Sequence, residues 1–334
     1  MPADIHATTL TLDSHIDIRW PEPPDPLAEG PMRVDFPKMQ RGGLRAAVFI
    51  AYVGQGKRDA AGHAAAAERV DAMLRHIQGR ADGEARRFCT TPDELEAAHA
   101  AGALAVLSAV ENGYAMGHDL GAPARWRALG ACYLTLTHDG HNDLADSARP
   151  QARLGDTPEE HGGLSALGRQ AVGALNDAGM LVDVSHVAKS GMLQAAALSR
   201  SPIVATHTAC RALCDHPRGI DDEQLDALKA VGGLAQITAM PSFLKKVPEG
   251  QRNPAGVEDM VDHVDHAVRR IGLEHVGLSS DFDGGGAVEG WQNPAETPNL
   301  TAALIKRGYG AREIGLLWSG NFLRLWRQAQ AIAR

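Results

Sequence analysis

Short apolar runs alternate along the whole chain with longer amphipathic stretches. The runs have the length of buried β-strands, and the stretches between them have the periodicity of helices. Strands that alternate with helices form parallel sheets, and eight of them predict an α/β fold, a (β/α)8 TIM barrel. A doubly wound open sheet is the alternative. The eight expected strands cover residues 11–17, 45–53, 103–111, 132–138, 180–186, 202–207, 233–240 and 275–281.

Three of the intervening stretches carry helix signals. Residues 65–77 are amphipathic, and residues 164–179 end at Gly179, which suits a helix C-cap. The stretch from residue 221 starts with acidic residues and stops at Gly232. The Pro-rich segment 21–26 is a loop too short to separate domains, so residues 1–334 are expected to form a single domain.

Composition and charge narrow the class of protein. A net charge of −8 without a long Lys/Arg run argues against nucleic-acid partners. No apolar run suits a membrane span or a leader, so we expect no membrane partner and a cytoplasmic location. The four cysteines are expected to be free thiols, and Cys210 with Cys214 is a weak candidate for half a zinc site. Asp262 and His266 are expected on the solvated face of a helix.

Six of the eight expected strands end in a histidine or a carboxylate. In a parallel barrel the C-terminal ends of all strands open on one face, so side chains distant in sequence converge there. This pattern of positions is the strongest functional signal in the chain. The residues are His15, Asp17, Glu111, His138, His186, His207 and Asp281.

These residue types suit a metal site. Imidazole and carboxylate ligands bind zinc and its neighbours in the first transition row. His15 and Asp17 are two residues apart, so on a strand they point to the same side. His186 and His207 end neighbouring strands and suit a second ion, with Glu111 between the pairs. The residues therefore predict a bridged two-metal centre. Asp13 lies deeper on the first strand and is expected to have a supporting role.

Five motifs resemble those of the membrane (renal-type) dipeptidase family, a family of zinc metallopeptidases. They occur in the family's order over nearly the whole chain. In sequence they are D-S-H-I-D, Y-L-T-L-T-H followed by N-D-L-A-D-S, V-D-V-S-H, A-T-H-T-A-C-R-A-L-C-D-H-P-R and G-L-S-S-D-F-D-G.

The resemblance implies a barrel hydrolase of the amidohydrolase kind that holds two zinc ions and cleaves dipeptides. It implies His15 and Asp17 as ligands of the first zinc, Glu111 as the bridge, and His186 and His207 as ligands of the second. His138 matches the histidine that contacts the scissile carbonyl, and Arg218 matches the arginine that binds the substrate carboxylate. Asp281 matches the catalytic acid/base at the metal centre.

The expected reaction is attack on the peptide bond by a metal-bridged hydroxide. Asp281 would transfer the proton, and His138 would stabilise the oxyanion. The resemblance leaves open a D-residue at the C-terminal position of the substrate, and a homodimer. Two alternatives are a related binuclear barrel hydrolase acting on another amide, lactone or phosphoester, and an inactive binding protein. Residues 232–244 lack the tyrosine that the family commonly has there.

Overall fold

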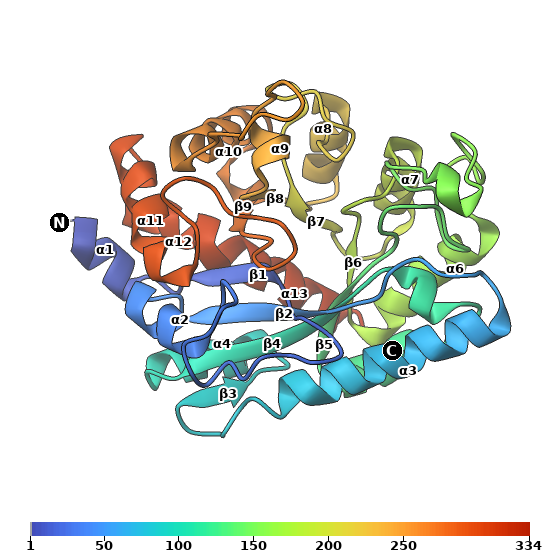
Figure 1. The fold of residues 1–334 in the computed structure, drawn as a ribbon, viewed down its shortest axis with the longest axis horizontal. Helices are drawn as coiled ribbons and strands as arrows, with labels where there is room; N and C mark the ends of the chain where they lie inside the picture. The colour runs from blue at the N-terminus through green and yellow to red at the C-terminus, as the bar shows by residue number, and fades with distance from the viewer. Residues whose placement is uncertain (1) are drawn as a thin grey trace.

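The computed structural model describes residues 2–334 and contains a nearly closed barrel of eight parallel strands (Figure 1). The predicted (β/α)8 barrel is therefore confirmed, and the doubly wound open sheet is wrong. The barrel strands, in spatial order, are β1 (Leu12–Asp17), β2 (Ala46–Tyr52), β4 (Leu104–Glu111), β5 (Ala131–Thr135), β6 (Leu181–Asp183), β7 (Val204–Thr208), β8 (Leu234–Thr238) and β9 (Val276–Ser279).

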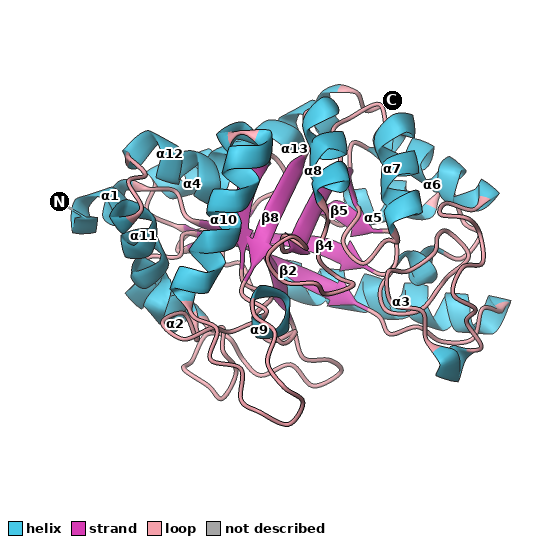
Figure 2. Ribbon diagram, turned by 90° about the horizontal axis from the view of Figure 1, so that it is seen from above, coloured by secondary structure: helices cyan, strands magenta, loops and turns pink. Residues whose placement is uncertain are grey.

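Helices surround the strands, as Figure 2 shows from above. Apolar side chains from both faces of the strands are buried in two hydrophobic clusters, and the buried residues include four tryptophans. The helices are α1 (Pro2–Thr8), α2 (Phe36–Gly42), α3 (Ala60–Gln78), α4 (Pro92–Ala100), α5 (Ala122–Ala128), α6 (Ala166–Ala178), α7 (Lys189–Leu198), α8 (Asp222–Ala230), α9 (Pro241–Leu244), α10 (Val257–Ile271), α11 (Thr297–Lys306), α12 (Ala311–Gly315) and α13 (Asn321–Ala331).

The barrel closes through backbone hydrogen bonds between the end of β1 and the residues just beyond β9. The Asp281 amide donates to the His15 carbonyl (3.1 Å), and the Asp17 amide donates to the Phe282 carbonyl (3.0 Å). The buried carboxylate of Asp13 accepts a hydrogen bond from the Ser280 amide (3.0 Å). Asp13 therefore joins the first and last strands directly beneath the candidate ligands.

The expected helices are present, with small shifts at their ends. Helix α3 begins before residue 65 because the Asp59 side chain caps it, accepting from the Gly62 amide. Helix α6 ends at Gly179, whose φ of 68° is left-handed. Helix α8 ends two residues before Gly232. In residues 2–334, no helix is both long enough and apolar enough to span a bilayer.

The sequence reading missed one strand and overestimated the length of several others. Strand β3 (Arg86–Phe88) pairs with β4 outside the barrel order and is too short to show a periodicity. Strands β5, β6 and β9 end earlier than expected, so His138, His186 and Asp281 lie two or three residues beyond them. These side chains occupy loops at the C-terminal mouth of the barrel, which do not continue the β-ladder.

The minor candidates bind other protein groups. All four cysteines are free and buried, as predicted, and Cys210 Sγ lies 3.4 Å from the His263 carbonyl. On α10, Asp262 pairs with Arg307 (2.7 Å) and His266 with Asp222 (2.9 Å). Asp262 and His266 are therefore engaged in ion pairs with protein side chains, and no metal is needed to account for them.

Candidate metal centre

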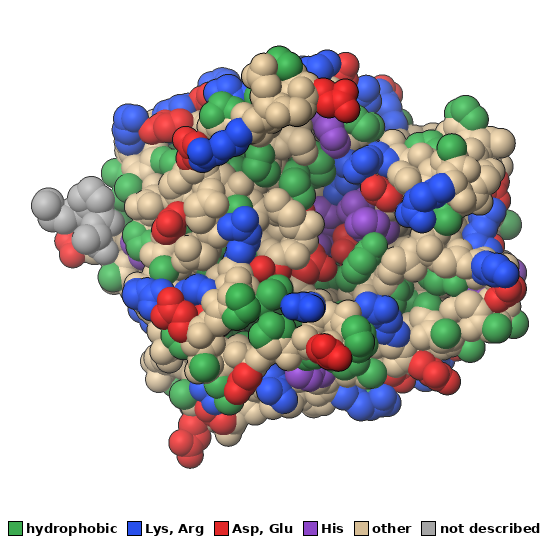
Figure 3. All heavy atoms as spheres, in the orientation of Figure 1, with side chains coloured by type: hydrophobic (Ala, Val, Ile, Leu, Met, Phe, Trp, Pro, Cys, Tyr) green, Lys and Arg blue, Asp and Glu red, His purple; other side chains and the backbone are tan. Residues whose placement is uncertain are grey.

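A cavity of about 700 Å³ opens at the C-terminal mouth of the barrel. Figure 3 shows it as a hollow in which histidine and acidic side chains are visible, with arginine or lysine side chains around them. His15 is buried below it. The structure thus brings the side chains singled out in the sequence to one place. Those lining the cavity are Asp17, Glu111, His138, His186, His207, Arg218 and Asp281.

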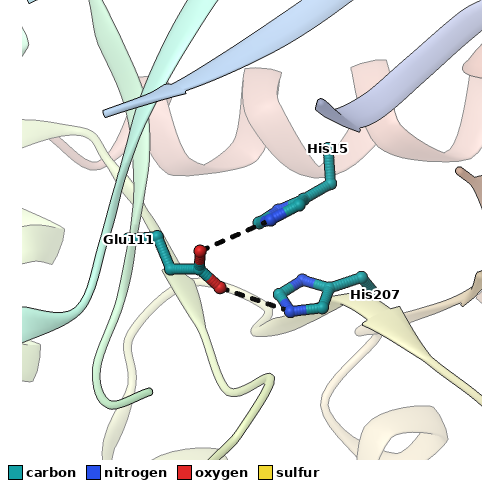
Figure 4. A group of neighbouring side chains, drawn as sticks. All are labelled: His15, Glu111 and His207. Carbon is teal, nitrogen blue, oxygen red and sulfur yellow. Dashed lines mark ion pairs between the residues drawn. The ribbon is translucent and has the colours of Figure 1, made fainter. Parts of the chain in front are cut away.

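Glu111, the last residue of β4, lies at the centre of this group. Its Oε2 faces His15 Nε2 (3.6 Å), and its Oε1 faces Nε2 of both His186 and His207 (3.3 Å each). Figure 4 shows the two oxygens pointing to His15 and His207. The two oxygens of this carboxylate therefore face different imidazoles, one oxygen facing His15 and the other facing His186 and His207.

Carboxylates complete the side of Glu111 that faces His15. His15, Asp17 and Asp281 each place one ligand atom within 4.8 Å of the others. His15 Nε2 lies 4.0 Å from Asp17 Oδ2. A Cβ at residue 284 would collide with the carboxylates of Asp17 and Asp281, so this position requires glycine. The glycine after D-F-D therefore allows the two acids to approach each other.

The geometry of this group fits divalent metal ions. Two ligands about 2.0–2.1 Å from a tetrahedral zinc ion lie roughly 3.3 Å apart, close to the separations of 3.3 and 3.6 Å around Glu111. His15 Nε2 and Glu111 Oε1 are buried without a hydrogen-bond partner among the described residues. Buried polar atoms are nearly always satisfied, so these two atoms point to a missing ligand.

Protonation in the metal-free protein reflects the crowded charges. Burial raises the pKa of Asp281 to about 7, although His15 opposes the shift. Burial lowers the pKa of His15, but Glu111, Asp17 and Asp281 outweigh it and raise that pKa to about 9. Burial also acts against ionisation of Glu111, but the surrounding histidines hold its pKa well below the usual range. Without metal, a protonated His15 therefore balances the Glu111 anion.

Strained backbone also gathers at this site. The non-glycine residues with left-handed φ among the described residues are Asn112 (81°), His186 (66°), Asp281 (60°) and Asp283 (63°). Two are candidate ligands, and the other two lie within two residues of one. Such conformations persist where the surrounding structure fixes them, typically at functional sites.

A phenol fixes the orientation of His15. Tyr133 of β5 donates its only hydroxyl proton to the Ser14 carbonyl (2.8 Å). Its oxygen must therefore accept from His15 Nδ1, which lies 2.9 Å away. When His15 loses its second proton, as it must to bind a metal, the remaining proton is on Nδ1 and the Nε2 lone pair faces Glu111.

Carboxylates support the other two histidines. His186 Nδ1 lies 3.3 Å from Asp139 Oδ1, and the other oxygen of Asp139 pairs with Arg149 (3.0 Å). His207 Nδ1 lies 3.0 Å from the Thr206 hydroxyl, which donates to Asp183 (2.7 Å). A histidine that donates from one nitrogen to such a partner presents the other nitrogen to a metal.

Asp183 also stabilises the barrel between β6 and β7, where the strand pairing is short. Strands β6 and β7 share one register pair, Asp183 with Val204. The buried Asp183 carboxylate accepts from the Thr135 hydroxyl and from the Ser185 and Thr206 amides, besides the Thr206 hydroxyl. It therefore links three strands where the ladder is short.

His138 and Arg218 face the same cavity from different loops. Burial, followed by the neighbouring His186, lowers the pKa of His138 to about 3, so His138 is neutral. Its ring lies 4.1 Å from His186 and 4.7 Å from Tyr52, and one of its nitrogens groups with Glu111 and His186. Arg218 is buried; it donates to the His207 carbonyl (3.2 Å) and lies 5.3 Å from the Phe243 ring centroid. Its Nε is buried and has no hydrogen-bond partner in the described part of the chain.

The segment that departs from the family pattern also lines the cavity. Met240, Ser242 and Phe243 belong to its wall. An aromatic ring is thus present under Arg218, but Phe243 of α9 supplies it in place of a tyrosine after β8. This short helix therefore forms the part of the cavity wall next to Arg218.

Sequence reasoning missed the groups behind the histidines: Tyr133, Asp139, Asp183 and Thr206. Asp139 directly follows His138, and Asp183 lies two residues before Ser185 in V-D-V-S-H, so both were within the quoted motifs or next to them. Spacing along the chain does not indicate that Asp139 lies next to His186, or that Asp183 reaches His207 through Thr206, because these contacts cross between loops or strands.

Comparisons with known proteins agree with this architecture. The family model "Membrane dipeptidase (Peptidase family M19)" matches residues 2–334. The chain is 35% identical to Dipeptidase tcpJ of Claviceps purpurea over 72% of this chain, and spans only 57% of that relative's length.

Two solved structures show the same fold. The probable dipeptidase PvdM from Pseudomonas aeruginosa is 30% identical, with a TM-score of 0.92 over 99% of this chain and 98% of that one. A metallo peptidase from Rhodobacter sphaeroides, liganded with a phosphinate mimic of the dipeptide L-Ala-D-Ala, is 26% identical, with a TM-score of 0.83 over 96% and 99%. The chain therefore belongs to the membrane dipeptidase family, peptidase family M19.

Proposed function

We propose that the protein is a zinc-dependent dipeptidase with two ions bridged by Glu111. The observation that carries the proposal is the division of the Glu111 oxygens between His15 on one side and His186 with His207 on the other. Arg218 adds a cation suited to a free carboxylate in the same cavity. Family membership supports metal-dependent peptide hydrolysis.

His15, Asp17 and Asp281 would hold the first ion, and His186 with His207 the second. The metal ions, when bound, would supply Lewis acidity and an activated water at neutral pH. The unpartnered Nε2 of His15 and Oε1 of Glu111 support this assignment.

The protein's own side chains would position the peptide and move its protons. Arg218 binds the C-terminal carboxylate of the dipeptide, which restricts substrates to short peptides and aligns the scissile bond. Neutral His138 donates a hydrogen bond to the carbonyl oxygen as negative charge develops there. Asp281, with a pKa raised to about 7 in the metal-free protein, takes a proton from water and delivers it to the leaving amine.

We further propose that the cavity accepts a D-residue at the C-terminal position of the dipeptide. The related Rhodobacter sphaeroides peptidase binds a mimic of L-Ala-D-Ala. Hydrolysis of L-Ala-D-Ala and L-Ala-L-Ala at comparable rates is the expected result. Cleavage of the L,L-dipeptide alone would contradict this part of the proposal.

The Asp281→Asn variant tests the proposed proton transfer. Because the amide cannot accept the proton, kcat should fall about 10²- to 10⁴-fold. Zinc content, measured by atomic emission, should stay near two ions per chain, since the other ligands are intact. Retained activity would remove Asp281 from this role.

Activity and zinc assays separate the dipeptidase from the two alternatives, another barrel hydrolase and an inactive binding protein. A hydrolase of another amide, a lactone or a phosphoester would cleave that compound and not dipeptides. An inactive binding protein would cleave none of them, and a low zinc content would favour it. Arg218 favours the peptide, because neither a simple lactone nor a phosphoester offers it a free carboxylate.

A further inference from the structure

Besides Arg218, two arginines of the cavity have no carboxylate partner among the described residues. Arg19 follows the end of β1 and Arg69 lies on α3; both line the cavity, and neither forms an ion pair with any described residue. A third arginine of the lining, Arg149, is paired with Asp139. Arg19 and Arg69 therefore present free positive charge at the cavity wall.

The acidic side chains of the cavity are already engaged. Asp283 accepts from the backbone amides of Arg33 (2.8 Å) and Val34 (3.1 Å). Asp139 is shared by His186 and Arg149. The remaining carboxylates of the lining are the proposed metal-centre residues Asp17, Glu111 and Asp281. Once two divalent ions neutralise these three, the cavity is positive overall.

Arg69 and Arg218 lie on opposite sides of the barrel mouth. Arg69 is on α3, which follows β2, whereas Arg218 follows β7, and these strands are four places apart in a ring of eight. Figure 1 likewise shows α3 across the barrel from α8. The metal centre lies between the two walls, so a dipeptide whose C-terminal carboxylate binds Arg218 directs its N-terminal residue toward α3.

The wall around Arg69 suits a side chain with an apolar stem and a charged tip. Trp20, Met32 and Met73 also line the cavity, and Met73 lies one helical turn from Arg69. Trp20 packs against His76 of α3, with ring centroids 5.7 Å apart. Tyr52 contacts the His138 ring and connects the site of the carbonyl with the α3 wall.

We propose that this chain prefers dipeptides whose N-terminal residue is Glu or Asp, and that Arg19 and Arg69 determine this specificity. The inference rests on the proposed dipeptidase function and narrows its substrate class. A guanidinium forms charge-assisted hydrogen bonds with a carboxylate, and a neutral amide of the same shape forms weaker ones.

Matched dipeptides test the preference. The value of kcat/KM for L-Glu-L-Ala should exceed that for the isosteric L-Gln-L-Ala about tenfold, as expected for a charge-assisted contact. The ratio should decrease as salt rises from 0.05 to 0.5 M, roughly as screening predicts. In the double variant Arg19→Met, Arg69→Met the ratio should approach one. Arg312→Met removes an exposed arginine on α12, outside the cavity lining, and should leave the ratio unchanged.

Each contrary result has a distinct meaning. Equal cleavage of L-Glu-L-Ala and L-Gln-L-Ala by the parent protein would overturn the specificity inference and leave the dipeptidase proposal intact. A preference for L-Ala-L-Glu over L-Ala-L-Gln, without one at the N-terminal position, would also overturn it. Cleavage of no dipeptide by zinc-loaded protein would overturn both.

Discussion

The candidate metal centre has two halves, one around His15 and one around His186 and His207. They place their negatively charged side chains differently. On the side of His15, carboxylates occupy the ligand positions, and a neutral phenol stands behind the histidine. On the side of His186 and His207, the ligands besides Glu111 are neutral imidazoles, and carboxylates stand behind them. Each half would thus provide negative charge near the ion proposed for it, at the ligand positions in one and behind the histidines in the other.

This difference explains why the groups behind the histidines are not interchangeable. Burial, together with the neighbouring carboxylate of Glu111, already raises the pKa of Asp17 and Asp281, and a further carboxylate behind His15 would add repulsion. A phenol behind His186 would leave that imidazole less basic than the carboxylate of Asp139 makes it. The comparison predicts that the two halves respond differently to substitution.

The largest effect should follow Glu111→Gln, because this residue serves both halves. An amide has one oxygen acceptor and no charge, so both ions should be lost together, with affinity reduced more than about 100-fold. Zinc content after dialysis against a weak chelator measures this. Retention of one ion at full occupancy would show that Glu111 belongs to one half alone.

Asp139→Asn should affect one half only. The amide removes the charge behind His186, and the affinity of the second ion should fall about 10- to 100-fold, with the first nearly unchanged. Competitive titration with a fluorescent chelator resolves the two binding steps. Equal weakening of both steps would contradict the proposed division.

Tyr133→Phe should have a smaller effect, on the other half. One neutral hydrogen bond is worth about 1 kcal/mol, so the affinity of the first ion should fall roughly fivefold. The same titration measures it, and the Asp139→Asn protein serves as the matched comparison. A larger loss of metal affinity in Tyr133→Phe than in Asp139→Asn would contradict the expected ranking of the two substitutions.

The smallest expected difference between the two halves is in the pH dependence of their metal affinity. In the metal-free protein the pKa of His15 is raised to about 9, so the stability from its protonation is complete below its ordinary pKa of 6.5 and lost as pH rises through 9. The pKa of His207 is lowered well below 6.5 by burial and by His15, so His207 has no proton to lose. At pH 7.5, calorimetry in buffers of different ionisation enthalpy should show proton release on filling the first half. Affinity there should rise between pH 6 and 9, and a flat profile would contradict the assignment.

The sequence was sufficient for the barrel and for the cluster of candidate ligands for a physical reason. Strand ends of a parallel barrel share one face, so His15, Glu111 and His207 converge whatever the details of the loops. The short strand β3 escaped prediction because three residues carry no periodicity. The ends of β5, β6 and β9 were placed too late because apolar residues such as Val184 continue into the loops.

The groups behind the histidines could not be predicted from sequence in the same way. Tyr133 lies on β5 and contacts His15 on β1, and Asp139 contacts His186 from a different loop. Such pairs depend on rotamers and on the distance across the barrel, not on spacing along the chain. The unpaired state of Arg19 and Arg69 likewise appears only once every neighbouring carboxylate has been placed.

A crystal structure of the zinc-loaded protein, with anomalous data at the zinc edge, tests the central claim most directly. We predict two zinc ions per chain, one bound to Glu111 Oε2 with His15 and one bound to Oε1 with His186 and His207. A single ion, or two ions of which only one contacts Glu111, would contradict the bridged centre.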